Sequence, residues 1–542
     1  MQHGTVNALD LDAWIRADPD PEHRAEMERW RAGQAIPNGA DTPLRFGTAG
    51  LRGEMGAGPG RMNRVVVRVT ARALGRELVA LGLADRGVVV GHDARPDSDN
   101  YALDTGRVLR RLGIPCTVVD GPIPTPVLAR LGLAHGAAAA VMVTASHNPR
   151  GDNGYKVYWS DGAQIRSPID AAIEARMDFE DLPGEDDLAP RHEVEQASPR
   201  AVIADYLGSV ITERAPAGGS PRVVYTALCG VGAETLDLAF ATAGLAPPLH
   251  VADQRRPDGS FPGLPFPNPE EPGTLDRAMA TADEAGIDIV LANDPDADRL
   301  GVAVKTDGVW RILTGDEIGV LLCERRIRMT AGADPVVASS VVSGGMVPAL
   351  CRARGIRHVS TLTGFKWIMR PAIDEPDATW VFGYEEALGF AVSDRVRDKD
   401  GVSAAVEFVL LLAELEQRQS TLSAHLTALS TELGVFSTAQ VSVRGTRREL
   451  DESLARIRRT PPAEIGGVPV SSVEDWLLRP VDSRTDLVVL ELGESGRVAI
   501  RPSGTEPKVK AYLEWRSRPG ESADDHEHRL GAMAAEIESL LR

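Results

Sequence analysis

The sequence predicts an α/β protein with three similar α/β domains, each containing a mixed sheet, followed by a smaller α+β domain. A chain of 542 residues is too long for a single hydrophobic core. Three stretches far apart in the chain share one plan: a Val-rich strand, a short turn, a helix, a Gly and a second strand. The C-terminal part instead alternates short strands and turns. The predicted domains span residues 1–205, 206–312, 313–432 and 433–542.

The three repeated units start at Val88, Val223 and Val336, and each is long enough to be a domain rather than one turn of a solenoid. Strand–turn–helix segments are common in any α/β protein, so a chance similarity is the alternative. The expected strand, helix and second strand of the successive units are 88–90, 102–112 and 116–119; 223–225, 234–243 and 250–251; and 336–337, 346–354 and 358–361.

The final domain is expected to contain several strands, two of them joined by the turn Gly493–Gly496, and two helices. Its expected strands are 488–492, 497–501 and 508–515, and its expected helices are 450–459 and 524–541. Two other segments, acidic 179–188 and Pro-rich 262–272, indicate surface loops or linkers.

Composition narrows the function classes. The net charge of −19 disfavours binding to nucleic acid or to anionic membranes, because both reward a basic surface. The chain shows no apolar run of about 18 residues, the length a membrane helix needs. The first thirty residues have no apolar core of a secretory signal, and the four cysteines lack CxxC spacing. We therefore expect a cytoplasmic protein with reduced thiols and no structural zinc; the sequence predicts no oligomeric state.

The first candidate site follows the expected buried strand 137–143. There, Ser146 stands where ligands bind in an open α/β sheet, and His147 offers a donor for an anion. We take Ser146 as the candidate nucleophile; an ordinary strand-to-turn connection is the alternative. A tight turn is expected at Gly151–Gly154, and Lys156 is expected to open the strand 156–159. This lysine could act as general acid or base if its pKa is depressed, or it could point to water.

A second candidate site is the acidic loop after the expected strand 287–291. Asp294, Asp296 and Asp298 repel one another, and a hard divalent cation is the simplest stabiliser, with magnesium favoured beside a phosphate. A calcium loop is excluded, because Arg299 and Lys305 take the sixth and twelfth positions, where glycine and glutamate belong. A solvated acidic turn remains the alternative.

Further loops carry weaker signals, and each could also be a solvated surface turn. The loop 501–508 combines Arg501 with hydroxyls and a Gly that permits close approach of an anion, as in a phosphate cradle. The loop 383–389 offers carboxylates to sugar hydroxyls. The Gly-punctuated loop 45–53 contains two arginines that suit an anion.

Four motifs, one per predicted domain and in order along nearly the whole chain, resemble those of the α-D-phosphohexomutase superfamily. They are Ser-His-Asn-Pro at 146–149, Asp-x-Asp-x-Asp-Arg at 294–299, Gly-Tyr-Glu-Glu at 383–386 and Arg-Pro-Ser-Gly-Thr at 501–505. The segments 46–53, 152–156 and 398–401 are most similar to the phosphoglucomutase-2 and phosphopentomutase-like branch. The resemblance implies four domains arranged around a central cleft.

The resemblance also implies roles for individual residues. Ser146 carries the phosphate, and an oxygen of this phosphoserine binds Mg²⁺ together with Asp294, Asp296 and Asp298. The candidates for proton transfer and charge stabilisation are Arg52, His147, Lys156 and Lys399. The residues expected to contact substrate are Arg299, Thr363, Gly364, Glu385, Arg501, Ser503, Gly504 and Thr505.

The reaction that this resemblance implies interconverts a sugar 1-phosphate and a sugar 6-phosphate through a sugar bisphosphate, with small-molecule sugar phosphates as the only expected partners. We expect glucose phosphates as substrates and glucose 1,6-bisphosphate, or the matching sugar bisphosphate, as activator. Many hexose-handling relatives have Ser where Ala387 stands, and some have His where Gly389 stands, so mannose and pentose phosphates stay open. A magnesium-dependent sugar phosphatase and a non-catalytic sugar-phosphate binder are more remote alternatives.

Overall fold

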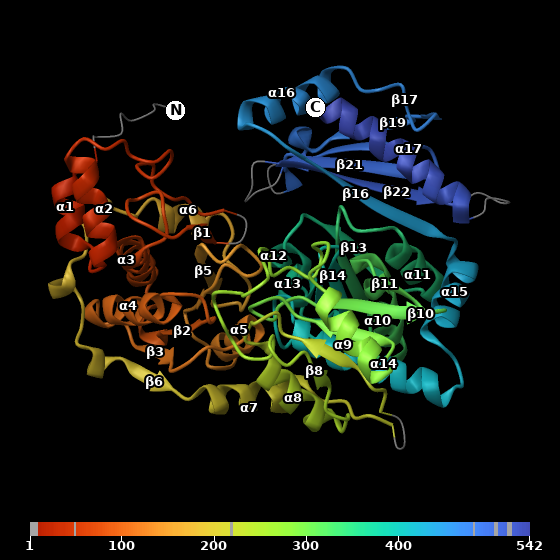
Figure 1. The fold of residues 1–542 in the computed structure, drawn as a ribbon, viewed down its shortest axis with the longest axis horizontal. Coiled ribbons are helices and arrows are strands. Elements are labelled where there is room, and N and C mark those ends of the chain that lie inside the picture. The colour runs from red at the N-terminus through yellow and green to blue at the C-terminus, as the bar shows by residue number, and fades with distance from the viewer. Residues whose placement is uncertain (1–8, 48–49, 217–219, 481–482, 503–507, 518–522) are drawn as a thin grey trace. The chain divides into compact units, whose positions relative to one another are not determined.

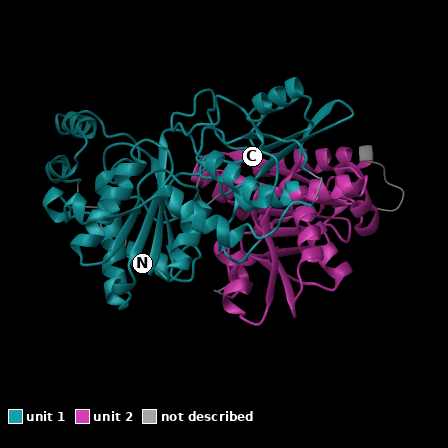
Figure 2. Cartoon of the chain, turned by 90° about the horizontal axis from the view of Figure 1, so that it is seen from below, with its two compact units in different colours: residues 1–312, 393–409 teal, residues 313–392, 410–542 magenta. Residues whose placement is uncertain are grey.

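The computed structural model describes residues 9–47, 50–216, 220–480, 483–502, 508–517 and 523–542. The chain forms two compact units, shown in Figure 2. Unit 1 contains residues 1–312 and 393–409, and unit 2 contains residues 313–392 and 410–542. The short segment 393–409 therefore joins unit 1 although the chain on both sides of it belongs to unit 2.

Three sheets share one strand order, which confirms the predicted repeat. In each, two parallel strands flank a central strand, and a fourth strand pairs antiparallel at one side. The four strands, in spatial order, are β3 (Cys116–Val119), β2 (Val88–His92), β4 (Ala139–Val143) and β5 (Asp152–Trp159) in the first domain; β8 (Leu249–His250), β7 (Val224–Thr226), β9 (Ile289–Ala292) and β10 (Gly301–Thr306) in the second; and β13 (Arg357–Thr361), β12 (Pro335–Ser340), β14 (Thr379–Glu385) and β15 (Gly389–Ala391) in the third.

The helix of each repeat ends where the sequence places a Gly. Gly113, Gly244 and Gly355 have φ values of 78°, 72° and 68°, in the left-handed region that favours glycine. The helices are α4 (Ser98–Arg111), α8 (Gly232–Ala243) and α11 (Met346–Arg354). The local sequence therefore fixes the length of each helix before its second strand begins.

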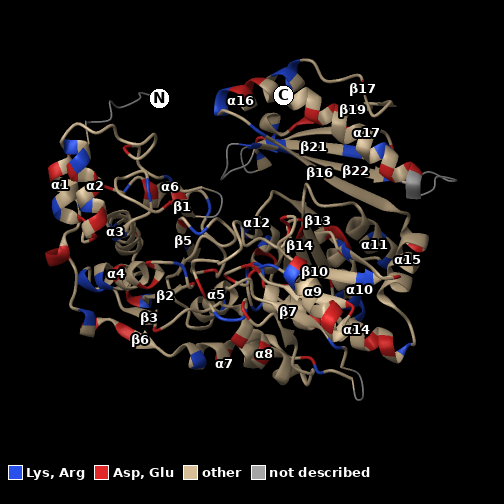
Figure 3. Ribbon diagram, viewed as in Figure 1, with Lys and Arg blue, Asp and Glu red and all other residues tan. Residues whose placement is uncertain are grey.

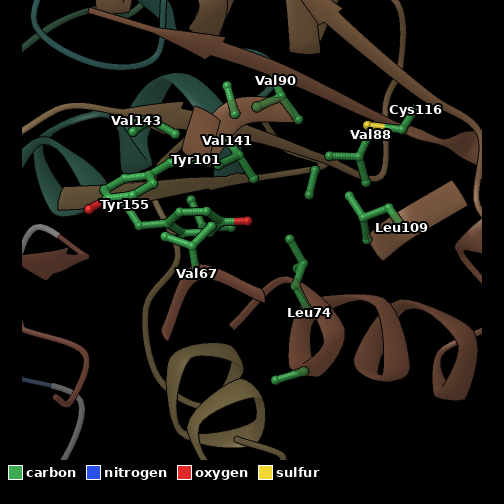
Figure 4. Packing of buried hydrophobic residues seen from close by; sticks show 14 of the residues in the cluster. Val67, Leu74, Val88, Val90, Tyr101, Leu109, Cys116, Val141, Val143 and Tyr155 are labelled. Carbon is green, nitrogen blue, oxygen red and sulfur yellow. The ribbon is translucent and has the colours of Figure 1, made fainter. Parts of the chain in front are cut away.

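The first sheet has two additional edge strands, β1 (Leu51–Glu54) beside β5 and β6 (Glu195–Ala197) beside β3. Alternate residues of a strand share a face, so the apolar side chains of β2 and β4 meet α3 and α4 in one core (Figure 4). The helices of this domain are α1 (Leu11–Ala17), α2 (Pro21–Arg31), α3 (Arg64–Ala80), α5 (Thr125–Ala134), α6 (Ile169–Glu174) and α7 (Pro199–Val210).

The prediction for the start of β5 was wrong. The expected tight turn Gly151–Gly154 is a turn only at its first residue, and β5 starts at Asp152 rather than at Lys156. The cause is the distant strand β1, which pairs antiparallel with these residues and places Gly53 opposite Asn153. Asn153 also donates to Pro96 O and Ser98 Oγ, both at 3.0 Å, so the segment is held as a strand.

The remaining elements complete the second and third domains. The second domain adds α9 (Asp276–Ala285) and the edge strand β11 (Val309–Ile312). The third adds α10 (Gly315–Met329), α12 (Phe365–Ile368), α13 (Arg370–Asp374), α14 (Gly401–Gln417) and α15 (Leu422–Leu433). Thr314 caps α10 with Glu317 in a reciprocal capping box.

The C-terminal domain has an antiparallel sheet that includes the three expected strands. Its strand order is β16 (Phe436–Arg444), β22 (Lys508–Arg516), β21 (Gly496–Pro502), β20 (Val488–Glu491) and β19 (Ser472–Asp475). Its two long helices, α16 (Arg447–Arg459) and α17 (Ala523–Leu541), were both expected. A small pair of strands is formed by β17 (Glu464–Ile465) and β18 (Val468–Pro469).

The repeat has a consequence for function. In each of the first three domains, one predicted motif occupies the connection from the third strand to the antiparallel fourth strand. Ser146 lies between β4 and β5, Asp294–Asp298 between β9 and β10, and Glu385 at the end of β14 before β15. Three of these strands, β5, β10 and β14, are labelled in Figure 1. The three domains therefore carry different functional side chains at the same position of a shared topology.

Charged residues of both signs are distributed along the chain. Figure 3 shows Lys and Arg interspersed with Asp and Glu along the helices of both units, although acidic residues are in excess over the whole sequence. Within the described residues, every helix is too short or too polar to cross a bilayer. All four cysteines are buried free thiols.

Candidate active site

Ser146 is held in a conformation that few non-glycine residues adopt. Its φ is 54°, and the residue is only 3% exposed. Its backbone N–H donates to Thr144 Oγ1 at 2.8 Å. Its hydroxyl donates to Asp294 Oδ2 at 2.7 Å and lies 3.2 Å from His147 Nδ1. The strained turn thus points the hydroxyl of the first domain at the acidic loop of the second.

The acidic loop is buried, and the alternative of a solvated turn is wrong. Asp294, Asp296 and Asp298 are each fully buried, and one oxygen from each lies within 4.8 Å of the others. Thr125, at the start of α5, anchors the loop to the first domain. Its N–H donates to Asp296 O at 2.9 Å, and its hydroxyl donates to Asp296 Oδ2 at 2.6 Å. The loop is therefore fixed from two domains of unit 1.

Two lysines from distant parts of the chain neutralise these carboxylates in part. Lys156 is buried on β5, and its Nζ donates to Asp296 Oδ2 at 2.7 Å and to Asp298 Oδ2 at 2.8 Å. Lys399 Nζ lies 3.1 Å from Asp298 Oδ2. Burial opposes the charge of Lys156, but Asp296 and Asp298 outweigh it and raise its pKa. The depressed pKa on which general acid or base catalysis by this lysine depended is therefore not found. The alternative of a strand-edge lysine in water is wrong.

The segment that carries Lys399 is anchored firmly in unit 1. Asp398 Oδ2 accepts hydrogen bonds from Tyr158 OH at 2.6 Å and from Gln164 Nε2 at 2.8 Å. Asp400 accepts from Tyr206 OH at 2.7 Å and caps the start of α14. These contacts hold Lys399 beside the acidic loop and explain why residues 393–409 join unit 1.

The donor set fits a hard divalent cation. Burial, together with Asp296 and Asp298, raises the pKa of Asp294 well above its ordinary value. Burial also works against the charge of Asp296, but Lys156 and Thr125 hold its pKa below the ordinary range. The Oδ1 atoms of Asp296 and Asp298 are buried and accept no hydrogen bond from the described residues. Clustered carboxylate oxygens with unused lone pairs are what Mg²⁺ prefers.

Two other predicted catalytic side chains border the serine. Burial, and next Arg299 and Arg52, lower the pKa of His147 well below its ordinary value, so its imidazole is neutral at pH 7. Arg52 lies on β1 and donates from Nη1 to Asn148 Oδ1 at 2.8 Å. The pairing of β1 with β5, which the sequence did not reveal, brings this arginine to the serine loop.

Arg299 closes the acidic loop. Its N–H donates to Asp294 Oδ1 at 3.0 Å, and its guanidinium donates to Glu270 Oε2 at 3.1 Å. The side chain of Asn293 also joins the two ends of the loop, because its Nδ2 donates to Arg299 O at 2.5 Å. Of the predicted site residues, unit 1 therefore brings together Arg52, Ser146, His147, Lys156, Asp294, Asp296, Asp298, Arg299 and Lys399.

The predicted sugar-contacting residues form a separate group in unit 2. Glu385 Oε1 accepts a hydrogen bond from Gly364 N at 2.7 Å, which joins the end of β14 to the loop that contains Thr363. The adjacent Glu386 is engaged differently. Its Oε2 accepts from Ser340 Oγ at 3.0 Å and from Ser343 Oγ at 3.1 Å. The two neighbouring carboxylates therefore have distinct surroundings.

The predicted phosphate cradle is described only in part. Arg501 is half-buried on β21, opposite Lys510 of β22. Ser503, Gly504 and Thr505 lie outside the described residues, as do Thr48 and Ala49 of the loop before β1. The cradle and the central cleft remain predictions.

Sequence reasoning missed three residues that support the site, namely Asp93 and Arg95 at the serine loop and Thr125 at the acidic loop. Asp93 and Arg95 lie within three residues after the end of β2, and Asp93 Oδ2 accepts from Thr144 Oγ1 at 2.7 Å. A signal was present, because charged residues at the carboxyl end of a predicted parallel strand belong to the edge where ligands bind. Thr125 offered no such signal, since it starts a helix far from any recognised motif.

Four family models match successive parts of the chain. Models of phosphoglucomutase/phosphomannomutase α/β/α domains I, II and III match residues 43–183, 204–308 and 314–431, and the model of the C-terminal domain matches residues 473–525. The matches follow the order of the four motifs along the chain.

Individual relatives extend over most of the chain. A Haemophilus influenzae protein named "Probable phosphomannomutase" is 38% identical over 85% of this chain and 95% of its own length. A mouse phosphopentomutase is 34% identical over 95% of this chain and 91% of its own. The fold matches a crystal structure of a phosphoglucomutase/phosphomannomutase family protein from Burkholderia thailandensis, with a TM-score of 0.68 and 23% identity over 91% of this chain and 97% of that one.

Proposed function

The chain belongs to the phosphoglucomutase/phosphomannomutase family of isomerases, and we propose that it interconverts glucose 1-phosphate and glucose 6-phosphate through a phosphate carried by Ser146. One observation carries the proposal. The Ser146 hydroxyl, in a strained turn, lies 2.7 Å from a buried carboxylate of the acidic loop. A nucleophile so close to a cluster suited to Mg²⁺ is the arrangement that phosphoryl transfer requires.

The proposed reaction has two transfers that mirror each other. In the first, the bond from Ser146 Oγ to phosphorus breaks, a sugar hydroxyl oxygen bonds to that phosphorus, and the hydroxyl proton passes to a base of the site. The sugar bisphosphate then reorients, and its other phosphate returns to Ser146 Oγ. Both sugar ends must therefore meet the same serine in turn. His147 Nδ1 lies 3.2 Å from Ser146 Oγ, within hydrogen-bond reach, but its lowered pKa makes the imidazole a weak base, so we propose that it orients the serine oxygen.

We propose two different roles for the lysines and arginines of unit 1. Lys156 and Lys399 compensate the charge of the acidic loop, and Arg52, which contacts the serine loop, and Arg299, which follows the acidic loop, are proposed to steady a phosphoryl group. Asp294, Asp296 and Asp298 would hold Mg²⁺. When bound, this ion supplies charge neutralisation and polarisation of the phosphoryl oxygens.

In unit 2, Glu385 and the Thr363–Gly364 loop are proposed to contact sugar hydroxyls. Arg501, together with Ser503, Gly504 and Thr505, is proposed to bind the phosphate that is not reacting. A glucose 1,6-bisphosphate activator follows from the same scheme, because it delivers the first phosphate to Ser146. A phosphatase needs no second phosphate contact, so these residues favour the mutase over that alternative.

A phosphopentomutase is the second candidate. Ala387 and Gly389, at the turn after Glu385, provide no polar side chain for the additional hydroxyl group of a hexose. The mouse relative that matches 95% of this chain is named a phosphopentomutase. The preference between the two sugars therefore depends on the loop 385–389 rather than on the serine or the acidic loop.

A substrate panel tests both candidates. Glucose, mannose and ribose 1-phosphates are supplied with Mg²⁺ and a catalytic amount of the matching bisphosphate, and the products are followed by ³¹P NMR. We expect isomerisation, with glucose fastest, and a phosphate on Ser146 by mass spectrometry. Ser146→Ala should lose turnover while remaining folded, and Ser209→Ala on α7 is the control. Release of inorganic phosphate without isomerisation would identify a phosphatase, and tight binding without either reaction would identify a binder.

A further inference from the structure

One buried arginine outside the predicted site makes four hydrogen bonds with the serine loop and the start of β5. Arg95, three residues after the end of β2, is only 3% exposed. Its Nη2 donates to the carbonyl oxygens of Ser146 and Asn148, both at 2.6 Å. Its Nη1 donates to the carbonyl oxygens of Pro149 at 2.7 Å and Asp152 at 2.9 Å. A single guanidinium therefore holds four backbone carbonyls between the serine and the start of β5.

Asp93 supports the backbone N–H of Ser146, through the side chain of Thr144. Its Oδ2 accepts from Thr144 Oγ1 at 2.7 Å, and Thr144 Oγ1 in turn accepts from Ser146 N at 2.8 Å. Its Oδ1 accepts from Arg95 N at 3.0 Å, and its carboxylate lies 3.3 Å from Arg95 Nε. The N–H and the C=O of Ser146 are thus both fixed by one pair of neighbouring residues, Asp93 and Arg95.

The second domain covers this arginine. Arg95 Cζ lies 4.9 Å from the ring centroid of Phe261, which is 3% exposed. Nearby, a Cβ on Gly259 would meet Ala94 O at 2.3 Å and Arg95 Cα at 2.7 Å, so the two backbones are in direct contact. The loop of the second domain therefore packs on the residue that holds the serine of the first.

We propose that Arg95 is a positioning residue for phosphoryl transfer: its guanidinium, covered by Phe261, holds Ser146 in the left-handed conformation that points its hydroxyl at Asp294. A φ of 54° is costly for serine, and the turn persists only if its surroundings impose it. Arginine suits the task because its planar fork binds several acceptors at fixed angles, whereas lysine concentrates its donors at one point. The effect on catalysis rests on the proposed function; the effect on the loop does not.

The test compares Arg95→Lys and Arg95→Met with Arg68→Met. Arg68 is an equally buried arginine of the first domain, 1% exposed, which binds Asp104 and Glu185 and makes no contact with the serine loop among the described residues. We expect kcat of the Arg95 variants to fall about 100-fold, because small displacements of a reacting group have costs of that order, while KM stays within about threefold. Arg68→Met should lower the melting temperature but leave kcat nearly unchanged.

Two further measurements separate the possible failures. Crystal structures of the Arg95 variants should show Ser146 outside the left-handed region, and an unchanged loop would overturn the proposal. Equal losses of kcat in the Arg95 and Arg68 variants would also overturn it. If the wild type shows neither turnover nor phosphoserine, the proposed function fails while the loop geometry still decides the role of Arg95. If Arg95→Met does not fold, Arg95→Lys and Phe261→Leu provide the same comparison, with kcat expected to fall in both.

Discussion

The ammonium of Lys156 donates a hydrogen bond of 2.7 Å to the carboxylate of Asp296, and both side chains are buried. Lys156 belongs to the first domain and Asp296 to the second, so this ion pair connects two domains of unit 1. A second contact, 2.8 Å from Lys156 to Asp298, strengthens the connection. Because buried charges are costly without a partner, the pair makes the stability of unit 1 depend on the charge of its acidic loop.

Replacing the lysine should therefore destabilise the protein. For Lys156→Met in the absence of Mg²⁺, we expect a loss of about 3 kcal/mol in the free energy of unfolding, because buried carboxylates lose their cation. Saturating Mg²⁺ should reduce the difference, since the more negative loop binds the added cation more tightly. Urea unfolding with and without Mg²⁺ measures both effects.

The matched control is Lys305→Met. Lys305 also pairs with an aspartate at 2.7 Å, Asp283, but on the surface of the second domain. Surface pairs contribute about 1 kcal/mol or less, so this variant should unfold almost like the wild type with or without Mg²⁺. A Lys156→Met protein as stable as Lys305→Met would mean that the buried pair makes no net contribution.

Removing one carboxylate should weaken metal binding selectively. For Asp298→Asn, we expect the Mg²⁺-dependent rise in melting temperature to shrink and turnover to fall by about 100-fold or more, because the amide is a weaker ligand and the charge is lost. Asp283→Asn, outside the acidic loop, should retain the response to Mg²⁺. An unchanged Mg²⁺ titration in Asp298→Asn would remove this residue from the proposed metal site.

Much of this architecture could be predicted from the sequence because it is encoded locally. The Val-rich strands and the helix-ending glycines are short-range signals, and they correctly indicated the three similar domains. Ser146 and the acidic loop were recognisable because each follows a buried strand directly. The motif order then linked these local signals to one family.

The supports of the site could not be predicted in the same way, because their partners are distant in sequence. Thr125 contacts Asp296 across 171 positions, and Arg95 contacts the carbonyl of Ser146 across 51 positions. The start of β5 was misplaced for the same reason, since β1 imposes extended backbone on a segment that reads as a turn. Tertiary pairing, rather than local preference, decides these positions.

The adjacent carboxylates of unit 2 should give different phenotypes. Glu386 accepts from Ser340 and Ser343, so Glu386→Ala should lower the free energy of unfolding by about 2 kcal/mol, because two hydroxyls lose their acceptor. Glu385→Gln should instead reduce kcat/KM by at least about tenfold if this side chain contacts the sugar, with a smaller loss of stability. Steady-state kinetics and thermal melts on both variants check the assignment, and the reverse pattern would make Glu386 the sugar contact.

The pH dependence of stability should contain two opposing contributions from unit 2. Burial, assisted by Arg352, lowers the pKa of His358 to about 4. Burial also raises the pKa of the Asp316 carboxyl to about 6, despite the opposing hydrogen bond from Gly344 N. Both groups titrate in the folded protein at a pH different from that in the unfolded chain, whose values are 6.5 and 3.8.

The signs differ. Between about pH 4 and 6.5 the unfolded chain binds a proton at His358 more readily than the folded protein, so this contribution is present at high pH and lost as the pH falls. For Asp316 the folded protein binds the proton more readily, so its contribution is present at low pH and lost as the pH rises through about 6. Each amounts to about 3 kcal/mol at most, and together they largely cancel in the wild type.

Single variants should separate the two pH-dependent contributions that cancel in the wild type. His358→Gln retains a polar partner for Ser339, which lies 2.9 Å from His358 Nε2, and removes the loss of stability in acid. Asp316→Asn retains an acceptor for Gly344 N and removes the loss near neutral pH. Between pH 4 and 6.5 the stability of His358→Gln should therefore fall with rising pH relative to wild type, and that of Asp316→Asn should rise. Urea unfolding at several pH values measures both slopes; variants parallel to the wild type would show that neither group titrates as its surroundings indicate.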